Sequence, residues 1–342
     1  MRSRLVPFQT DIRIAGFALV ILLLIGGFSN SPWAKDFLTS FFAFGLLAMS
    51  LNLLIGYTGL ISFGHAAFFA FAGYTFGLLL QSDSFILFCG AAAVPLALVI
   101  TIVGTALYAL IIGAICVRLS EIYFAFLTLA FQMFLYSAII GWVDVTGGDQ
   151  GLMGGIPRPV FLGIDLSDQL HRYVFCAVLF VVCVTLLRLV TRSPFGYTLR
   201  MIRDNPQRTA FLGVNVFKVK LICFVIAGTI AGVGGVILAL FTSGAFPEWA
   251  FWTLSGQAIF MIMLGGLTVF AGPLVGTALL LMLNDTVQMV TSHVELVTGI
   301  VILVVVLGLR KGLLDVADER GWLSPAWLRS LWRLSLAKDR QP

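Results

Sequence analysis

The sequence predicts an all-α membrane protein with about ten transmembrane helices, some of them broken or re-entrant. Of the 342 residues, 60% are hydrophobic and only 11% are charged, and the mean hydropathy is +1.03. The apolar residues gather in runs of roughly 17 to 25, the length that a helix needs to cross the hydrocarbon of a bilayer. A soluble core can absorb one or two such runs but not about ten, so the composition argues against a large soluble domain.

The apolar runs follow one another with short polar gaps. A basic start precedes the first run, as in a signal peptide, but no small-x-small cleavage site closely follows its apolar part, so we expect an uncleaved first helix. The ten spans are predicted at residues 12–29, 37–55, 58–80, 88–114, 121–141, 172–190, 220–243, 253–270, 273–291 and 295–309. Residues 1–311 therefore form a transmembrane domain, and residues 312–342 follow it as a tail.

The charged residues of the loops give one orientation, because cytoplasmic loops of membrane proteins carry an excess of Lys and Arg. If the basic N-terminus lies inside, ten spans place the basic segment 191–220 and the pair Arg310 and Lys311 inside as well. The loop 142–170, with four Asp against one Arg, then lies outside. We therefore expect both termini to be cytoplasmic. The net charge of +5 reflects membrane topology in this interpretation and does not indicate nucleic-acid binding.

The tail alternates tryptophan with arginine. The residues that form this pattern are Arg320, Trp322, Trp327, Arg329, Trp332 and Arg333. This pattern predicts an amphipathic helix at the inner surface of the membrane, in contact with lipid. We expect deletion of the tail to leave assembly largely intact.

The segment 191–220 is polar, yet it is not built like a flexible spacer. Asn205 can cap a short helix, Pro206 suits its first position and Gly213 suits its end. The helix has an apolar side with no membrane to enter, made by Ala210, Phe211 and Leu212. We expect this side to fit a groove on a cytoplasmic partner. The alternative is a basic loop that docks on anionic lipid headgroups, but headgroup binding needs neither a helix cap nor a defined helix end.

Four stretches of the chain carry a resemblance to a known family. The stretch SPFGYTLRMIRDNPQRTAFLGVNVFKVKLICFVIAGTIAGVGG, which begins at Ser193, resembles the cytoplasmic coupling segment and following helix of the branched-chain amino acid (LIV-type) permeases of ABC importers, in particular the M-type subunit. The other three are SLNLLIGYTGLISFGHAAFFAFAGYTFGLLL (50–80), TGGDQGL (146–152) and MLGGLTVFAGPLVGTALL (263–280). Their order and spacing over most of residues 37–310 make the resemblance specific.

The sequence departs from the family pattern at two places. Pro206, Gln207 and Arg208 stand where many relatives carry a glutamate, and Thr268 stands where a glycine is usual. Neither departure changes the family to which the chain is similar.

The resemblance implies a type II ABC importer-like fold and a permease subunit that moves branched-chain or related hydrophobic amino acids across the bacterial inner membrane. It also implies a homologous H-type permease, two ATP-binding subunits and a periplasmic or extracellular solute-binding protein as partners. The sequence contains no G-x-x-x-x-G-K-[ST] motif. We therefore expect ATP and Mg to be bound by the partner ATPase subunits, and this chain not to be an enzyme. The residues expected to couple to the ATPase are Arg203, Asp204, Asn205, Pro206, Ala210, Phe211, Leu212 and Gly213.

Polar side chains inside apolar runs mark candidates for the pathway or its gate, because such side chains are costly in hydrocarbon. The stretch GYTGLISFGH has glycines that permit non-helical backbone, and such a break survives in a membrane only if it is buried in protein or faces a water-filled cavity. Its histidine either lines the pathway or is a hydrogen-bonded structural residue, and the two glutamines either line the pathway or bond between helices. The candidates are Asn52, Ser62, His65, Gln132, Gln257 and Asp285.

The stretch TGGDQGLMGGIP (146–157) in the loop 142–170 is predicted to be flexible and acidic on the side where a binding protein must dock, with Gly147 to Gly155 at the docking position. Part of it should form an outer gate or a docking ledge. The residues expected there are Gly147, Gly148, Asp149 and Gly151.

Small residues recur at helical spacing and predict close helix packing. The stretch AGTIAGVGG places Ala227, Ala231 and Gly235 four residues apart. The same spacing relates Gly228 to Gly232, Gly73 to Gly77, and Gly272 to Gly276.

Two other classes of function stay open at this point. A gradient-driven secondary transporter places ionisable groups near the midplane of broken helices, and Asp285 with the glycine-rich breaks is compatible with that class. Such a carrier has no need of an ATPase-coupling segment. A membrane scaffold is the third possibility. The sequence shows no pair of acids within a span, no H-E-x-x-H and no clustered Cys and His, so neither a catalytic nor a metal site is predicted.

Overall fold

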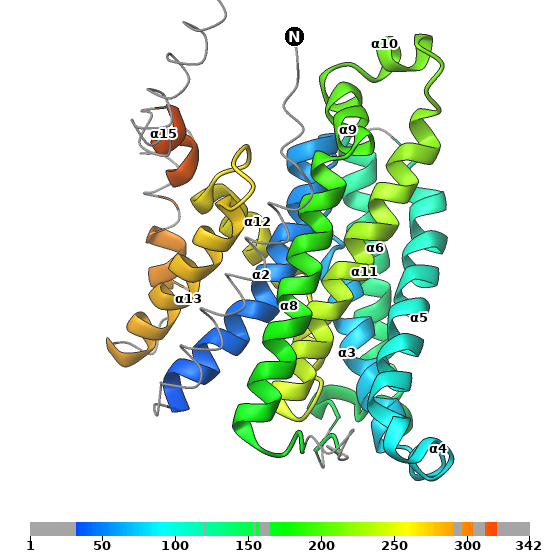
Figure 1. Cartoon of the computed structure of the whole chain (residues 1–342), viewed down its shortest axis with the longest axis vertical. Helices are drawn as coiled ribbons and strands as arrows, with labels where there is room; N and C mark the ends of the chain where they lie inside the picture. Colours follow the sequence, from blue (N-terminus) through cyan, green and yellow to red (C-terminus); the bar gives the residue numbers. More distant parts are fainter. Residues whose placement is uncertain are drawn as a thin grey trace, which may run out of the picture. The chain divides into compact units, whose positions relative to one another are not determined.

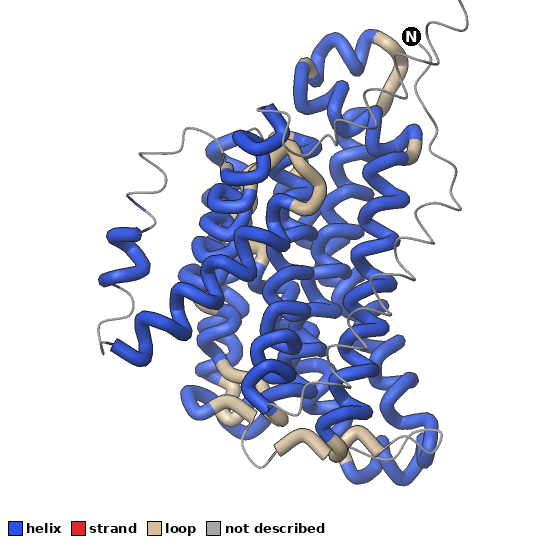
Figure 2. Tube along the Cα trace, turned by 60° about the vertical axis from the view of Figure 1, so that its left-hand side comes forward, coloured by secondary structure: helices blue, strands red, loops and turns tan. Residues whose placement is uncertain are grey.

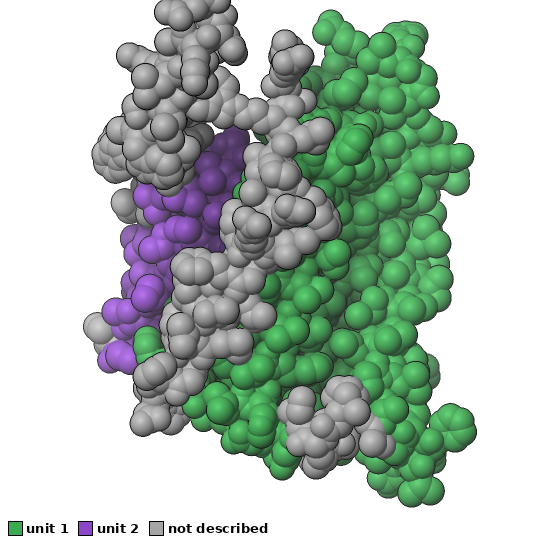
Figure 3. Space-filling model, viewed as in Figure 1, with its two compact units in different colours: residues 1–259 green, residues 260–342 purple. Residues whose placement is uncertain are grey.

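Helices form all the regular structure in the part of the chain that the computed structural model describes (Figure 1). The described residues are 32–119, 121–152, 155–157, 165–290, 296–301, 303 and 312–319. The all-α prediction is confirmed, whereas the predicted first span at 12–29 lies outside the described residues. The chain divides into two compact units, unit 1 at Met1–Ile259 and unit 2 at Phe260–Pro342 (Figure 3).

Unit 1 is built around five helices that are long and apolar enough to cross a membrane. These are α2 Pro32–Thr58, α5 Ala93–Cys116, α6 Glu121–Gly141, α8 Gln169–Arg192 and α11 Val216–Thr242. Shorter elements join them: α3 Ala66–Gln81, α4 Asp83–Cys89, η1 Gly90–Ala92, α7 Val143–Thr146, η2 Gly148–Gln150, α9 Pro194–Asp204, α10 Pro206–Phe211 and η3 Pro247–Ala250. The helix α12, Trp252–Gly265, begins in unit 1.

The long helices of unit 1 run side by side, with α11 in contact with α2, α3, α5 and α8 (Figures 1 and 2). The helices α9 and α10 lie at one end of unit 1, and α4 lies at the other (Figure 1). We call these the α10 end and the α4 end. The helices α2, α5 and α8 run from the α4 end to the α10 end, and α6 and α11 run in the opposite direction; the shorter α3 carries the chain back toward the α4 end between α2 and α5 (Figure 1).

Close packing around α11 depends on its small residues. A Cβ atom on Gly235 would stand 1.9 Å from the carbonyl oxygen of Phe69 in α3, and one on Gly228 would stand 3.0 Å from the Cβ of Ala109 in α5. Gly73 is covered in the same way by the ring of Trp249, at 2.9 Å. The close packing predicted from the small-residue spacing is therefore confirmed.

Some predicted boundaries were wrong, and local caps explain the differences. The side chain of Asn215 accepts a hydrogen bond from the backbone N–H of Lys218 (3.0 Å), so α11 begins before its basic residues rather than at residue 220. Gly266 has φ +124°, which ends α12 at Gly265 instead of at residue 270. The predicted span 88–114 is divided among α4, η1 and α5.

The predicted span 58–80 is not one helix. Gly59 has φ +75°, which ends α2, and α3 begins only at Ala66. The intervening segment Gly59–His65 turns back along unit 1, because His65 Nε2 lies 2.9 Å from the hydroxyl of Ser50, two turns before the end of α2. Eight helical residues span about 12 Å, so α3 starts well inside unit 1 rather than at its end. We call Gly59–His65 the first re-entrant segment.

A second re-entrant segment, Ser243–Phe251, enters from the opposite end. The N–H of Leu152, in the loop at the α4 end, donates to the carbonyl of Ala245 (2.8 Å). The carbonyl of Phe251 accepts from the side chain of Gln132, near the middle of α6 (2.8 Å). The helix α12 therefore also starts inside unit 1, and the predicted broken or re-entrant helices are found at α3 and α12.

Unit 2 contains α13, Gly272–Val290, and α15, Leu313–Glu319. A Cβ on Gly276 would stand 1.7 Å from the carbonyl oxygen of Met261, so α13 packs closely on the second half of α12. The carboxylate of Asp315, in α15, accepts hydrogen bonds from the backbone N–H groups of Leu267, Thr268 and Val269. The beginning of the tail is thus part of unit 2. We therefore restrict the expectation that the tail is dispensable to residues 320–342.

Candidate functional site

The predicted coupling helix is present with the caps that its sequence indicates. The side-chain oxygen of Asn205 accepts from the N–H of Arg208 (2.8 Å), and Pro206 occupies the first turn of α10. Gly213 has φ +85° and follows the end of the helix. The N–H of Asn205 also donates to the carbonyl of Met201 (3.0 Å), so one residue both ends α9 and starts α10. The two helices are therefore joined without a flexible linker.

The apolar side of α10 is free of the rest of the described chain. Phe211 is 91% exposed and Leu212 is 67% exposed, and Ala210 is exposed as well. Thr209, in contrast, is buried, and its hydroxyl donates to the carbonyl of Asn205 (2.9 Å). A large aromatic side chain held in solvent by a capped helix is a typical feature of a docking surface.

Two arginines of α9 contact the end of α2. The guanidinium of Arg203 donates to the carbonyl of Gly56. The guanidinium of Arg200 lies over the ring of Tyr57, 5.3 Å from its centroid, and donates to the carbonyl of Thr191 (3.1 Å). Arg203 and Asp204 were expected to guide the partner ATPase, and both are exposed, but the hydrogen bond of Arg203 is made within this chain.

A chain of polar contacts links the starting turns of α3 and α12. The N–H of Ala66 donates to the hydroxyl of Ser255 (2.9 Å), and that hydroxyl donates to the side-chain oxygen of Gln132 (2.7 Å). His65, Ser255 and Gln132 are fully buried. The N-termini of two helices that enter from opposite ends therefore meet beside the middle of α6. His65 and Gln132 thus make hydrogen bonds to residues of other elements, as one of their two interpretations expects.

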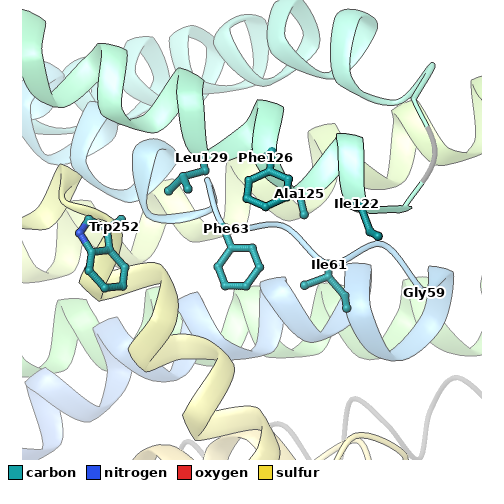
Figure 4. Close-up of a pocket in the computed structure, with 8 residues that line it drawn as sticks. All are labelled: Gly59, Ile61, Phe63, Ile122, Ala125, Phe126, Leu129 and Trp252. Carbon is teal, nitrogen blue, oxygen red and sulfur yellow. The ribbon is translucent and has the colours of Figure 1, made fainter.

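An apolar pocket of about 600 Å³ lies against the first re-entrant segment (Figure 4). Its lining residues are Gly59, Ile61 and Phe63 of that segment, Ile122, Ala125, Phe126 and Leu129 of α6, and Trp252 at the start of α12. Exposed and buried residues alternate along the segment, as in any extended chain, so Ile61 and Phe63 face the pocket while Ser62 is buried on the other side. The pocket is therefore lined by Ile61 and Phe63, the apolar residues on either side of the predicted pathway residue Ser62.

The remaining polar candidates are dispersed. Asn52 is buried on α2, and its side-chain oxygen, like the hydroxyl of Ser62 and Nδ1 of His65, makes no hydrogen bond among the described residues. Gln257 is exposed on α12, and Asp285 is half-buried on α13 in unit 2. Neither of these two lines the pocket.

The loop at the α4 end is more ordered than its glycines suggested. Gly147 and Gly151 have positive φ angles, and a Cβ on Gly147 would stand 1.9 Å from the carbonyl oxygen of Gly151. A Cβ on Gly151 would stand 2.3 Å from the carbonyl oxygen of Ala245, in the second re-entrant segment. Gly148 is buried, whereas Asp149 is exposed. The expectation of a flexible loop was wrong for residues 147–152, because these glycines serve tight turns and close contacts.

The acidic character of this loop continues toward α8. The backbone N–H of Ser167 donates to the carboxylate of Asp165 (2.8 Å), and this hydrogen bond lowers the pKa of the carboxyl below its usual value. Asp168 caps α8 by accepting from the N–H of His171. The loop therefore presents carboxylates to solvent at the α4 end.

Three functional contacts were missed from the sequence. The residues that make them, Ser50, Ser255 and Arg200, were not among the candidates that the sequence analysis singled out. The serines carried a weak sequence signal, since Ser50 stands two residues before Asn52 and Ser255 two residues before Gln257, both polar candidates. No sequence signal indicated the contact between Arg200 and Tyr57, because Tyr57 lies 143 positions earlier in the chain.

Comparison with known proteins adds the family. The family model described as "Branched-chain amino acid transport system / permease component" matches residues 34–307. The chain is 23% identical to the high-affinity branched-chain amino acid transport system permease protein LivM of Salmonella typhimurium, over 87% of this chain and 74% of LivM. It is 26% identical to the guanosine ABC transporter permease protein NupQ of Bacillus subtilis, over 59% of this chain and 62% of NupQ.

A third relative has the name of the other permease type. The probable branched-chain amino acid transport permease protein LivH of Methanocaldococcus jannaschii is 26% identical, over 56% of this chain and 61% of LivH. No solved structure matches the chain. The family model covers most of the chain and includes α10, both re-entrant segments and the pocket. The chain therefore belongs to the family of permease components of branched-chain amino acid transport systems, as an M-type, multi-pass membrane subunit of an ABC transporter.

Proposed function

We propose that this chain is a permease subunit of an ATP-driven importer that moves branched-chain or related hydrophobic amino acids across a bacterial inner membrane. The observation that carries the proposal is the exposed Phe211 on the capped helix α10. A rigidly presented apolar side chain outside the membrane-spanning helices is suited to fill a groove on an ATPase subunit. The names of the LivM relatives support the class of substrate.

The partners in this proposal are an H-type permease, two ATP-binding subunits and an external solute-binding protein. ATP and Mg bind to the ATP-binding subunits, and this chain performs no catalysis. The similarity to both LivM and LivH proteins supports pairing with a homologous permease.

The charges of unit 1 support an orientation with the α10 end in the cytoplasm. Basic residues gather at that end: Arg118, Arg200, Arg203, Arg208 and Lys218. Acidic residues gather at the α4 end: Asp83, Asp144, Asp149, Asp165 and Asp168. The acidic loop then faces the solute-binding protein, and the residues Gly147 to Gly151 form a rigid docking ledge.

Cysteine labelling tests this orientation. In a chain with Cys89→Ser, which removes the one half-buried native thiol among the described residues, a membrane-impermeant maleimide should label Asp149→Cys in intact spheroplasts. Lys218→Cys, at the α10 end, should react only after the membrane is permeabilised. The reverse pattern would contradict both the orientation and the docking role of α10.

The apolar pocket supports a pathway for hydrophobic solutes. Its volume lies in the range typical of small-molecule sites, and its aliphatic and aromatic lining suits an apolar side chain. Ile122 and Phe126 are exposed at its rim, so a second permease is needed to enclose it. The first re-entrant segment, at the pocket wall, is then the part of the pathway that can open and close.

Filling the pocket should block transport. We expect Leu129→Trp to lower ATP-dependent uptake about tenfold or more, because the larger indole narrows the pocket between α6 and the re-entrant segment. The matched control is Ile111→Trp, on an exposed face of α5, which should transport normally. Normal uptake by Leu129→Trp in correctly assembled complexes would exclude the pocket from the pathway.

Substrate class is tested with the cognate solute-binding protein. We expect that protein to bind leucine, isoleucine or valine and the reconstituted complex to accumulate the same amino acid. Similarity to NupQ makes guanosine the informative competitor, and the aromatic side chains Phe63, Phe126 and Trp252 are compatible with a stacked base. If the complex accumulates guanosine but not leucine, the transported substrate is a nucleoside rather than an amino acid.

A further inference from the structure

The contacts between α9 and the end of α2 have a geometry that a spacer helix does not need. Arg203 donates to the carbonyl of Gly56, one of the last four carbonyls of α2 and therefore without a partner inside the helix. The neighbouring carbonyls of Leu54 and Ile55 accept instead from the N–H groups of Leu60 and Gly59. A cationic side chain at a helix C-terminus is also favoured by the helix dipole.

Arg200 also contacts the last turn of α2, through the ring of Tyr57. It lies three residues before Arg203 and thus on the same face of α9. Its guanidinium is stacked between the rings of Tyr57 (5.3 Å) and Tyr197 (5.1 Å), where cation–π attraction favours a planar cation. Together the two arginines contact Gly56 and Tyr57 in the last turn of α2. The Cγ of Arg203 also lies 3.5 Å from the position of a Cβ on Gly59, the first residue of the re-entrant segment.

The last turn of α2 leads directly into the first re-entrant segment. Gly59, Ile61 and Phe63 of this segment line the pocket. Its far end is anchored elsewhere: a Cβ on Gly64 would stand 2.1 Å from the carbonyl oxygen of Thr128 in α6, and His65 is bonded to Ser50. The segment is therefore held at one end by α9 and at the other by α6 and α2. Displacement of α9 must change the backbone between these two attachments.

We propose that Arg200 and Arg203 form a clamp that transmits movement of α10 to the pocket wall. This inference rests on the proposed function, since it requires a partner that moves α10. The path consists of α10, the shared residue Asn205, α9, the two guanidinium groups, the end of α2 and the segment Gly59–His65. Arg203 is a positioning residue in this account, and its hydrogen bond is with the carbonyl of Gly56 in the chain itself rather than with the ATPase.

The test compares binding with coupling in reconstituted complexes. Arg203→Ala should retain the co-purified ATPase subunits and basal ATP hydrolysis, while solute transported per ATP falls about tenfold, within the range typical of coupled sites. Arg203→Lys can still donate one hydrogen bond to the carbonyl of Gly56, so it should recover much of the loss. Lys218→Ala, an exposed cation at the start of α11, is the matched control and should transport normally.

A structural readout separates transmission from simple stability. In a Cys89→Ser background, a cysteine at Ile61 on the pocket wall should react with a small thiol reagent at different rates in nucleotide-free and vanadate-trapped complexes. Arg203→Ala should remove this difference. If Arg203→Ala keeps both the difference in reaction rate and the normal amount of solute transported per ATP, the proposal of a clamp is wrong. Loss of ATPase binding by Arg203→Ala would also overturn the clamp proposal, because Arg203 would then be needed to hold α9 and α10 in their folded positions rather than to transmit their movement. Absence of uptake in the unmodified complex would instead refute the proposed function.

Discussion

Replacement of Phe211 by Asp is expected to detach the ATPase subunits from the permease. The ring of Phe211 is almost fully exposed in the chain alone, so in the proposed complex it fills the partner groove. A carboxylate in its place would be buried there without a counter-charge, at a cost of about 3 kcal/mol or more, which weakens binding about 100-fold or more. Because Phe211 lies on α10, outside the membrane-spanning helices, and is 91% exposed, insertion and pairing with the second permease should be unaffected.

Co-purification of the ATPase and stimulated ATP hydrolysis are the measurements for this variant. Phe211→Leu is the conservative partner and should retain most of the association, since it keeps an apolar side chain. Lys218→Ala should behave as the unmodified chain, because exposed charges contribute at most about 1 kcal/mol. A correctly inserted Phe211→Asp chain that still binds and stimulates the ATPase would show that α10 is not the coupling element.

Replacement of Asp315 by Ala is expected to destabilise unit 2 by about 3 kcal/mol or more, since hydrogen bonds to a charged group contribute about 1.5 to 3 kcal/mol each. The carboxylate is only 7% exposed. It accepts from three consecutive backbone N–H groups, of which Leu267 is the closest (2.9 Å), and from the hydroxyl of Thr268 (2.6 Å). Alanine would leave these donors without partners. Hydrogen exchange at residues 267–269 should accelerate about 100-fold, and the complex should lose its native state at a lower temperature.

Truncations provide the control for this prediction. A chain that ends after Glu319 keeps Asp315 and should be as stable as the full chain, whereas a chain that ends at Lys311 should behave like Asp315→Ala. Thr268→Gly removes one of the four hydrogen-bond donors to the carboxylate and keeps the three backbone N–H donors, so its effect should be smaller than that of Asp315→Ala. Unchanged exchange at residues 267–269 in Asp315→Ala would contradict the role given to this carboxylate.

The features that the sequence predicted well are those set by neighbouring residues. The coupling helix depends on Asn205, Pro206 and Gly213, which act within a few positions of one another, and the structure has the caps that they indicate. The long apolar helices depend on composition over a window, and the close packing at Gly235 depends on spacing along one helix. Each of these can be read without knowledge of the fold.

The features that the sequence did not predict depend on distant residues. The glycines of the stretch GYTGLISFGH indicated a break, but its depth depends on the contact of His65 with Ser50 and of Gly64 with Thr128. Polarity suggested Ser62 for the pathway, whereas the extended backbone turns Phe63 toward the pocket instead. The buried carboxylate of Asp315 was assigned to a surface tail, because its backbone donors lie almost 50 residues earlier in the chain.

The most direct test of the central claim is leucine uptake into proteoliposomes that contain this chain with its permease partner, the ATPase subunits and the solute-binding protein. The account predicts accumulation that requires ATP hydrolysis on the side of α10, requires the binding protein on the opposite side, and is lost with Phe211→Asp. Accumulation driven by an ion gradient in vesicles that lack the ATPase subunits would contradict the account and establish a secondary transporter.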